Sequence, residues 1–163
     1  MGKYDLVEEV LRSMGAEFFF DAVAIRPGKP AVFAVCEGKP VFGLPGNPVS
    51  TMVTFELFVV PAMDLWSGAG ARALPFVEVV LAEDLQEKPG MTHFLPARVE
   101  WDEASADSAG FANGAGKVRA LKWRGSGDIG AMVQANCYLV VAAELSHVVA
   151  GSRVPILLRG DVV

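Results

Sequence analysis

The sequence predicts a two-part fold: an α/β region over residues 1–72, followed by a small all-β barrel over residues 73–163. The first part alternates helix-like and strand-like segments, which is typical of an incomplete α/β unit with a parallel-type sheet. The second part has short strand-like runs divided by turns that contain glycine and proline. A run of small residues, 67–71, lies between the two patterns and indicates a linker.

The elements of the first part follow from the spacing of apolar residues. Apolar side chains recur at helical spacing over residues 4–14, and Gly15 is a typical helix stop. Three strands are predicted after it, over residues 18–25, 31–36 and 40–44. This order, one helix and then three strands before the next helix, is the basis for the α/β prediction.

A second, longer helix is predicted over residues 48–66. Pro61 is expected to kink it, because proline has no N–H for the helical hydrogen bond. The segment is apolar enough to raise the question of a membrane span. Glu56 and Asp64 within it argue against one, so a buried helix and no membrane partner are predicted.

The second part is predicted to be built from strands joined by short turns. The five strand-like runs cover residues 76–81, 92–100, 117–123, 137–142 and 153–158. Between the second and third, residues 102–116 have the composition of a mobile hairpin loop, with no evident chemistry. A small barrel or sandwich is the expected architecture.

Composition limits the classes of function. The 163 residues are 52% hydrophobic and 20% charged, which is sufficient for a sizeable core. The net charge of −5 argues against non-specific binding of nucleic acid, which needs a basic surface. Cys36 and Cys137 lie far apart and outside any metal-ligand pattern, so we expect buried free thiols in a cytoplasmic protein and no metal site built from Cys and His.

The segment Gly43–Ser50 is the most informative stretch of the chain. Its two prolines and two glycines favour a fixed strand-to-helix turn. Asn47 is a favoured N-cap residue, and Pro48 then falls at the first helical position. The free amides of that first turn and the helix dipole predict an anion site, although such turns also serve simply to pack a helix on a sheet.

A second turn, Arg26–Pro30, strengthens the prediction of an anion site. If the sheet is parallel, this turn lies on the same side as the first one. Arg26 offers a planar fork for an oxyanion and Lys29 a compact charge, whereas either residue alone would fit a solvated turn. The predicted oxyanion-binding residues are Arg26, Gly28, Lys29, Pro45, Gly46, Asn47, Pro48 and Ser50.

Three further residues are secondary candidates, each with a simpler explanation. Asp5 begins the first helix, where an acidic residue favours the helix dipole in any case. Ser126 lies in a Gly-Ser-Gly turn that is too common to specify phosphate binding. Arg98 interrupts an apolar strand and is expected to pair at an interface. No catalytic residue and no metal-ligating set are evident from spacing.

At these residues the chain resembles the molybdopterin molybdenumtransferase family, which includes MoeA and the E domain of gephyrin. The resemblance lies in three elements in order: the start Gly2–Asp5, the segment Ile25–Pro30 and the segment Leu44–Ser50. Residues Phe55–Pro61 continue it, and the 125–127 turn followed by Ala135-Asn136 resembles the family's last domain. It covers most of this chain but only the later part of the family's architecture. The first 72 residues resemble the second half of a molybdopterin-binding domain.

The resemblance implies a function in molybdenum cofactor biosynthesis. The family inserts molybdate into adenylylated molybdopterin and releases AMP, supported by a divalent metal, usually Mg²⁺, in an elongated homodimer. By this resemblance Arg26 and Lys29 attract the anionic substrate, Pro45 and Pro48 shape the loop, and Ser50 contributes a hydroxyl. The small-molecule partners implied are molybdopterin and molybdate.

Two readings of the chain's role stay open at this point. The two earlier domains of the family do not precede residue 1, so we expect the chain to be inactive alone and to act as part of a longer enzyme. The alternative is a non-catalytic, protein-binding scaffold module of the gephyrin type. The sequence does not distinguish molybdenum from tungsten handling.

Overall fold

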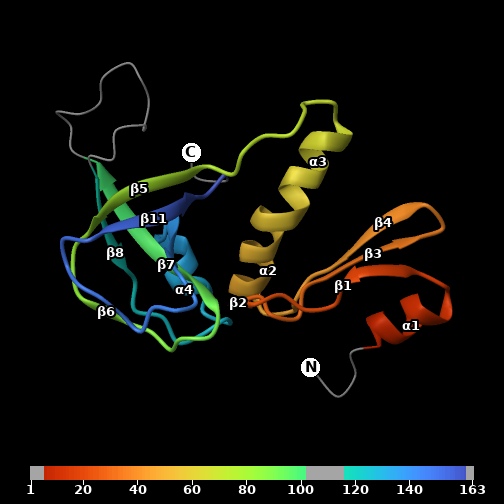
Figure 1. Ribbon diagram of the computed structural model, residues 1–163, viewed down its shortest axis with the longest axis horizontal. Helices are drawn as coiled ribbons and strands as arrows, with labels where there is room; N and C mark the ends of the chain where they lie inside the picture. The colour runs from red at the N-terminus through yellow and green to blue at the C-terminus, as the bar shows by residue number, and fades with distance from the viewer. Residues whose placement is uncertain (1–5, 102–115, 161–163) are drawn as a thin grey trace.

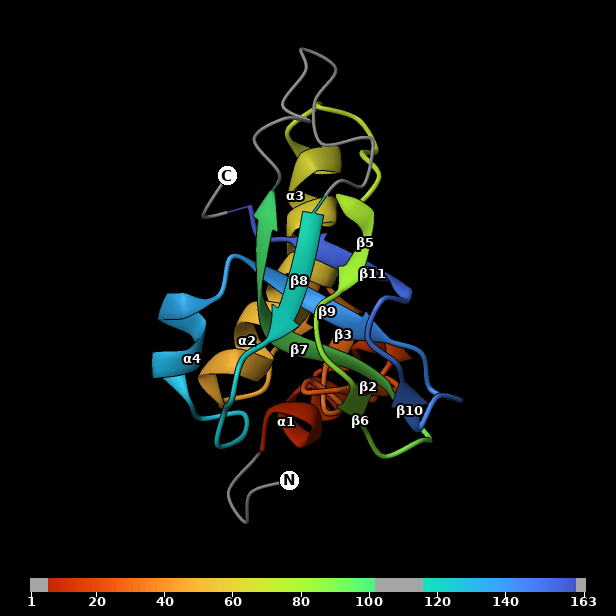
Figure 2. The ribbon, with the colours of Figure 1, turned by 90° about the vertical axis from the view of Figure 1, so that its left-hand side faces the viewer.

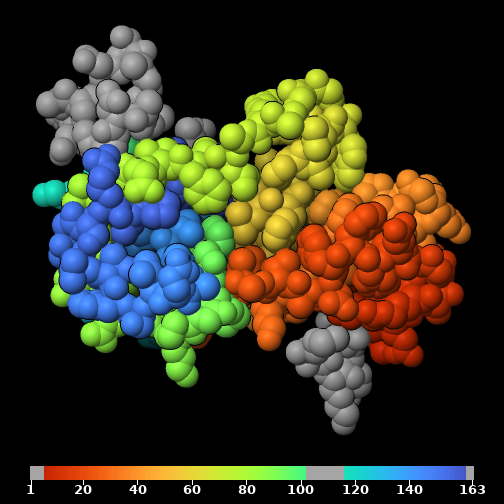
Figure 3. Space-filling model, in the orientation of Figure 1, coloured from red at the N-terminus to blue at the C-terminus, as the bar shows by residue number. Residues whose placement is uncertain are grey.

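The computed structural model describes residues 6–101 and 116–160. Figure 1 shows a barrel on one side, a three-stranded sheet with a short helix on the other, and one long helix between them. The space-filling view in Figure 3 shows the corresponding two lobes, with the long helix filling the space between them. The predicted hairpin loop over residues 102–116 lies outside the described residues, except Gly116.

The first sheet is antiparallel. Its strands are β1 (Glu17–Phe20), β3 (Val32–Cys36) and β4 (Lys39–Gly43), in the order β1-β3-β4. The predicted parallel arrangement is therefore wrong for these three strands. The physical reason is the connection from β3 to β4: Glu37 and Gly38 have φ of 51° and 74°, a two-residue hairpin, whereas a parallel pair needs a crossover of about a dozen residues or more.

The strand predicted over residues 18–25 is divided in the structure. After β1 the chain leaves the first sheet and forms β2 (Ile25–Arg26), which pairs in parallel with strand β7 of the barrel, Ile25 opposite Thr92 and Arg26 opposite His93. Figure 1 shows β2 at the junction of the two lobes. The second half of the predicted strand therefore connects the lobes instead of extending the first sheet.

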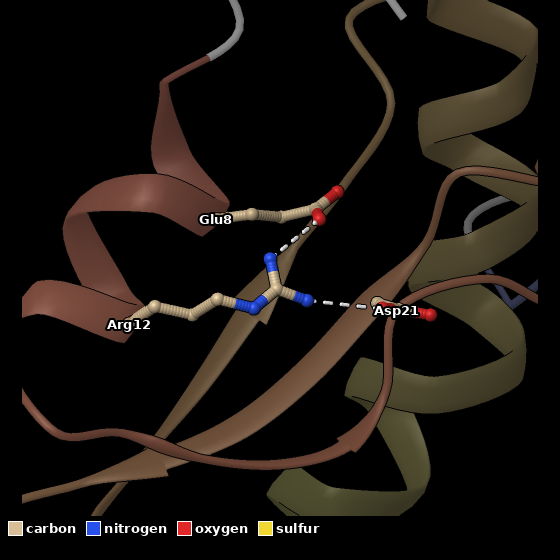
Figure 4. A network of polar contacts seen from close by, with 3 residues as sticks. All are labelled: Glu8, Arg12 and Asp21. Carbon is tan, nitrogen blue, oxygen red and sulfur yellow. Dashed lines mark hydrogen bonds and ion pairs between the residues drawn. The ribbon is translucent and has the colours of Figure 1, made fainter.

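Helix α1 (Val7–Ser13) is linked to the first sheet by one arginine. Arg12 lies 3.1 Å from Glu8 and 3.0 Å from Asp21, as Figure 4 shows, and its guanidinium stands 4.5 Å from the centre of the Phe18 ring. Arg12 and Asp21 are about half exposed to solvent, so their ion pair orients the helix but contributes little to stability.

The long helix is regular at its ends and widened in its middle. Helix α2 (Pro48–Thr54) passes into a π-helical turn, η1 (Phe55–Val59), and then into α3 (Val60–Trp66). The wide turn comes directly before Pro61, which cannot donate a helical hydrogen bond and whose ring crowds the preceding turn. A π-helical turn thus lies just before the proline, and the kink expected at Pro61 stays a prediction.

The long helix is buried only at its beginning. Val49 and Val53 are fully buried, whereas Met63, Leu65 and Trp66 are more than half exposed. The predicted buried helix is thus wrong for its second half, although the Trp66 ring still contacts the ring of Phe42 in β4, 6.2 Å between centres. By length and composition alone, Pro48–Trp66 would be long and apolar enough to cross a membrane, and one such helix is weak evidence for a span.

The second lobe is a closed barrel of five strands. These are β5 (Phe76–Leu81), β7 (Thr92–Trp101), β8 (Gly116–Ala120), β9 (Cys137–Val141) and β11 (Arg153–Leu158). Their order is β7-β8-β5-β11-β9, and a further pairing of β9 with β7 closes the ring. All pairs are antiparallel except β5 with β8. The predicted small barrel is confirmed.

Three short elements of the second lobe were not predicted. Strand β6 (Leu85–Gln86) pairs with β10 (His147–Val148), and helix α4 (Ile129–Gln134) lies on one side of the barrel in Figure 2. Their lengths of two and six residues are too short for apolar periodicity to reveal them.

Two apolar cores hold the chain together. The first fills the barrel, around Val79, Leu139 and Ile156. The second lies between the lobes, where Val49 and Val53 of α2 contact barrel-side residues that include Phe94, Met132, Tyr138 and Leu157. The two lobes therefore share a core, which fixes the start of the long helix against the barrel. Cys36 and Cys137 are buried free thiols as predicted, and burial raises the pKa of Cys137 to about 12.

Gly28 is required where the β2 turn meets α2. Its φ is +119°, and an added Cβ would lie 2.7 Å from Cγ2 of Thr54. We expect Gly28→Ala to lower the free energy of unfolding by about 2 kcal/mol, through backbone strain and overpacking. Urea denaturation would measure the loss.

Gly46→Ala is the matched control, because no atom would lie within 4 Å of its Cβ and its φ is not positive. It should change the free energy of unfolding by only about a few tenths of a kcal/mol, as expected for an unstrained site. Equal stability of the two variants would show that the close approach at Gly28 does not constrain the junction.

Candidate functional site

A cavity of about 680 Å³ lies at the junction of the two lobes. One wall is made by the turn after β2 and by the loop that leads into α2. The other wall comes from the barrel: the segment before β7, and the loop after β8 with Trp123, Arg124 and Ser126. The cavity is therefore a feature of the assembled lobes, and neither lobe forms it alone.

Backbone hydrogen bonds hold the two walls together. Besides the pairing of β2 with β7, the Val49 amide donates to the carbonyl oxygen of Ser126 at 2.9 Å. This corrects one expectation, because the Val49 amide belongs to the first helical turn and was predicted to be free for an anion. Pro48 occupies the first helical position as predicted, and Asn47 is the N-cap residue, although its side chain makes no capping hydrogen bond.

Side-chain hydroxyls fix the loop before α2. Oγ1 of Thr51 donates to the carbonyl oxygens of Pro45 and Asn47, and Oγ1 of Thr54 donates to the carbonyl oxygen of Ser50 at 2.8 Å. These bonds tie the first turns of α2 to the loop before it. Pro45 and Ser50 are buried in this part of the cavity wall. The predicted rigidity of this segment therefore arises from threonine hydroxyls as well as from its prolines.

Three cationic side chains converge on the cavity. Arg26 and Lys29 come from the first wall and Arg124 from the second, and all three residues are exposed to solvent. Among the described residues, Glu87 is the carboxylate that lines the same cavity. The local charge is thus positive in a chain whose net charge is −5, so an anion would be captured by this site and not by the field of the whole protein.

Asp128 orders the loop that carries Arg124. Its carboxylate accepts hydrogen bonds from the amide of Arg124 at 3.0 Å and from the amide of Ala131 at 3.2 Å, where it caps α4. The bond from the Arg124 amide is the main cause that holds the pKa of Asp128 below its ordinary value, and the Ala131 amide adds to it. These two bonds therefore fix the loop that carries Arg124 to the start of α4.

A buried histidine forms part of the barrel wall. Nδ1 of His93 lies 3.0 Å from Oε2 of Glu87, and Nε2 lies 2.8 Å from the carbonyl oxygen of Lys88. The histidine side chain is 2% exposed. Five lining residues of the barrel lie in separate segments and come together only when the barrel closes. The sequence therefore has no motif that would predict Glu87, Met91, His93, Trp123 and Arg124 as site residues.

The structure brings most of the predicted site residues together. Seven line the cavity: Arg26, Gly28, Lys29, Pro45, Asn47, Ser50 and Ser126. Gly46 and Pro48 belong to the same loop but do not line it. Arg98 lies apart, in a small hollow of the barrel surface with Glu100 and Arg119, and Asp5 is outside the described residues.

No set of metal ligands is assembled in the part of the chain that the structure describes. Within residues 6–101 and 116–160, no three or more His, Cys, Asp or Glu side chains gather as a metal ion would require. His93 and Glu87 contact each other instead. The cavity is lined instead by arginine, lysine and serine side chains, whose groups could donate hydrogen bonds to an anion.

Two family models match the chain. The model described as a probable molybdopterin binding domain matches residues 1–64, and the model described as the MoeA C-terminal region (domain IV) matches residues 78–158. Both walls of the cavity thus fall within matched segments.

Named relatives agree with the two models. The chain is 32% identical over 158 residues to the molybdopterin molybdenumtransferase of Staphylococcus aureus strain Mu50, a match that covers 97% of this chain and 35% of that protein. It is 33% identical over 184 residues to the gephyrin of Dictyostelium discoideum, covering 99% of this chain and 24% of that protein.

Solved structures show the same architecture. A crystal structure of the molybdopterin biosynthesis MoeA protein from Pyrococcus horikoshii superposes with a TM-score of 0.72 at 26% identity, covering 94% of this chain and 34% of that one. A molybdenum cofactor biosynthesis protein from Pyrococcus furiosus gives 0.63 at 28% identity, covering 87% and 45%. The chain therefore spans less than half the length of these proteins.

The role of Asp128 in the loop predicts a pH-dependent stability. Because its pKa is lowered on folding, its contribution to the free energy of unfolding is present at neutral pH and is lost as the pH falls below the ordinary carboxyl value of 3.8. Wild type should therefore be more stable than Asp128→Ala at pH 7, and the difference should shrink in acid. Urea denaturation of both proteins at several pH values would measure it.

Asp84→Ala is the matched control. It also removes a carboxylate that accepts a hydrogen bond from a loop amide, here that of Ala150, but in a different loop. Its effect on the exchange of the Arg124 amide with deuterium should be nil, whereas Asp128→Ala should accelerate that exchange. A stability difference for Asp128→Ala that is constant from neutral to acid pH would contradict the assignment.

Proposed function

Because the chain belongs to the MoeA family of molybdenum cofactor biosynthesis proteins, we propose that its cavity holds the oxyanion groups of that pathway's substrates, molybdopterin and molybdate. The reaction proposed is the insertion of molybdate into adenylylated molybdopterin, with release of AMP. The chain spans about a third of the length of such relatives, so it would take part in this reaction together with regions like those that it does not span in them.

The observation that carries the proposal is the convergence of three cations from two lobes on one cavity. Phosphate and molybdate are both tetrahedral oxyanions. The fork of Arg26 or Arg124 is suited to two oxygens of such a group, and the Lys29 ammonium supplies a compact third charge. The buried Ser50 and the half-buried Ser126 bring hydroxyls to opposite walls, where each can donate to a further oxygen.

The Mg²⁺ that the family resemblance implies does not fit the described residues of this cavity. Mg²⁺ takes six oxygen ligands and is usually held by one or two carboxylates besides substrate phosphates. The described lining offers the carboxylate of Glu87, and that group faces His93 at 3.0 Å. No step is therefore assigned to a metal in this part of the protein. A cytoplasmic homodimer of the longer protein remains part of the proposal.

A protein-binding scaffold role is the second candidate function. The observation that favours it is the outer face of α1, where Leu6, Val7 and Val10 are at least half exposed and line a shallow hollow with Leu11. An exposed apolar face of this kind fits a polypeptide better than an oxyanion. Calorimetry separates the candidates: a folded chain that binds neither molybdate nor molybdopterin would favour the scaffold role.

Removal of one cavity cation should weaken oxyanion binding. We expect Arg26→Ala to reduce the affinity for molybdate about tenfold or more, because a charge-assisted hydrogen bond is lost. Isothermal titration calorimetry of the full chain would measure it. In a full-length relative that carries the corresponding arginine, the same substitution should slow molybdenum insertion.

Arg153→Ala is the matched control, because Arg153 is an exposed arginine of β11 that does not line the cavity. It removes the same charge from the protein and should leave the affinity for molybdate within about twofold of wild type, since exposed charges at a distance are screened. Equal losses in the two variants would show that molybdate responds to net charge and not to this site.

A further inference from the structure

The barrel wall of the cavity carries an imidazole and a carboxylate in direct contact. Nδ1 of His93 lies 3.0 Å from Oε2 of Glu87, and Nε2 lies 2.8 Å from the carbonyl oxygen of Lys88. The side chains of His93 and Glu87 are 2% and 22% exposed, and both residues line the cavity. His93 is therefore shielded from bulk water, whereas Glu87 is partly exposed, and both adjoin the proposed oxyanion site.

The two contacts of the imidazole determine how many protons the pair holds. A carbonyl oxygen only accepts hydrogen bonds, so Nε2 of His93 must carry a hydrogen and donate it to Lys88. Nδ1 faces a carboxyl oxygen, and that contact is a hydrogen bond only when a second proton lies on the imidazole or on the carboxyl group. Without this proton, a nitrogen lone pair would face a carboxylate at a buried position, which is unfavourable.

The charged groups around the pair determine how this proton affects the binding of an anion. Arg26 is the register partner of His93 in the parallel β2–β7 pair, and Lys29 and Arg124 line the same cavity. On the other side of β7, strand β9 places the apolar Val141 opposite His93. With the proton the Glu87–His93 pair is neutral, and the three cations act undiminished on an anion. Without it the pair is negative and opposes them.

We propose that the Glu87–His93 pair positions a proton in the wall of the oxyanion site, and that binding of a tetrahedral dianion is linked to retention of that proton. The inference rests on the proposed function, since it concerns the same cavity. It assigns to Glu87 and His93 a role in tuning affinity, distinct from the direct contacts of Arg26, Lys29 and Arg124. A pair without this proton carries one more negative charge beside the ligand, which weakens the binding of the dianion.

Titration calorimetry of the full chain with sulfate and with molybdate tests the linkage. Sulfate is a suitable probe because it keeps both negative charges over the range scanned, from about pH 5 to about pH 8, where imidazole ordinarily titrates. Wild-type affinity should fall about tenfold across this range, as expected for one added negative charge near the ligand. At the upper end, measurements in two buffers of different ionisation enthalpy should show proton uptake on binding.

Three variants make the test specific. His93→Gln keeps an amide donor but has no proton to lose. In Glu87→Gln the amide can donate to Nδ1 of a neutral His93, so the second proton is no longer needed. Both variants should therefore make the affinity nearly independent of pH. His147→Gln is the matched control: His147 is the other histidine of the chain, lies 3.7 Å from Asp84, and does not line the cavity. It should keep the wild-type dependence on pH.

The outcomes separate this inference from the proposed function. If wild type binds sulfate or molybdate but His93→Gln or Glu87→Gln keeps the full pH dependence, the linkage is wrong and the oxyanion site stands. If His147→Gln removes the dependence, the linkage is also overturned. If the folded wild-type chain binds neither anion at any pH, the proposed function fails and the inference fails with it.

Discussion

The docking of one helix start onto the barrel is the interaction on which the rest of this structure depends. The Val49 amide donates to the Ser126 carbonyl oxygen, and directly behind this bond Val49 and Val53 are fully buried in the core that the lobes share. Burial of two valines stabilises the contact by about 3 kcal/mol or more. Strand β2 adds a parallel pairing to β7 on the same side. Together these contacts bring two loops of the first lobe against two segments of the second, one before β7 and one after β8.

The cavity owes its electrostatics to this docking and not to the composition of the chain. The net charge of −5 would repel an anion, but the junction concentrates Arg26, Lys29 and Arg124 around one space. Only one carboxylate of the described residues lines that space, and it is engaged by a buried histidine. Under the proposed function, a local positive site would admit a small anion, whereas an extended polyanion would also meet the net negative charge of the chain.

Much of the fold could be predicted from the sequence, since strands and turns of ordinary length leave clear periodic signals. All five barrel strands and the extent of the long helix follow from such signals. The antiparallel first sheet could not be predicted, because apolar runs do not report strand direction. Likewise β2 has two residues, and its partner strand lies 67 residues later in the chain, where the shape of the barrel places it (Ile25 opposite Thr92).

Part of the candidate site could likewise be predicted from the sequence, and part could not. The turns at Arg26–Pro30 and Pro45–Ser50 were predicted as one site because proline, glycine and cations mark them, although the reason offered, a shared parallel sheet, was wrong. Arg124 and the Glu87–His93 pair carried no such mark, since they are single residues in segments that only the closed barrel places beside the turns.

The central claim is that cations from the two lobes bind one anion. A double-mutant cycle of Arg26→Ala and Arg124→Ala tests it most directly, with molybdate affinity as the measured quantity. Each variant should lose about tenfold, and the double variant should lose clearly less than the product of the two. Full affinity in Arg124→Ala beside a weakened Arg26→Ala would contradict the claim.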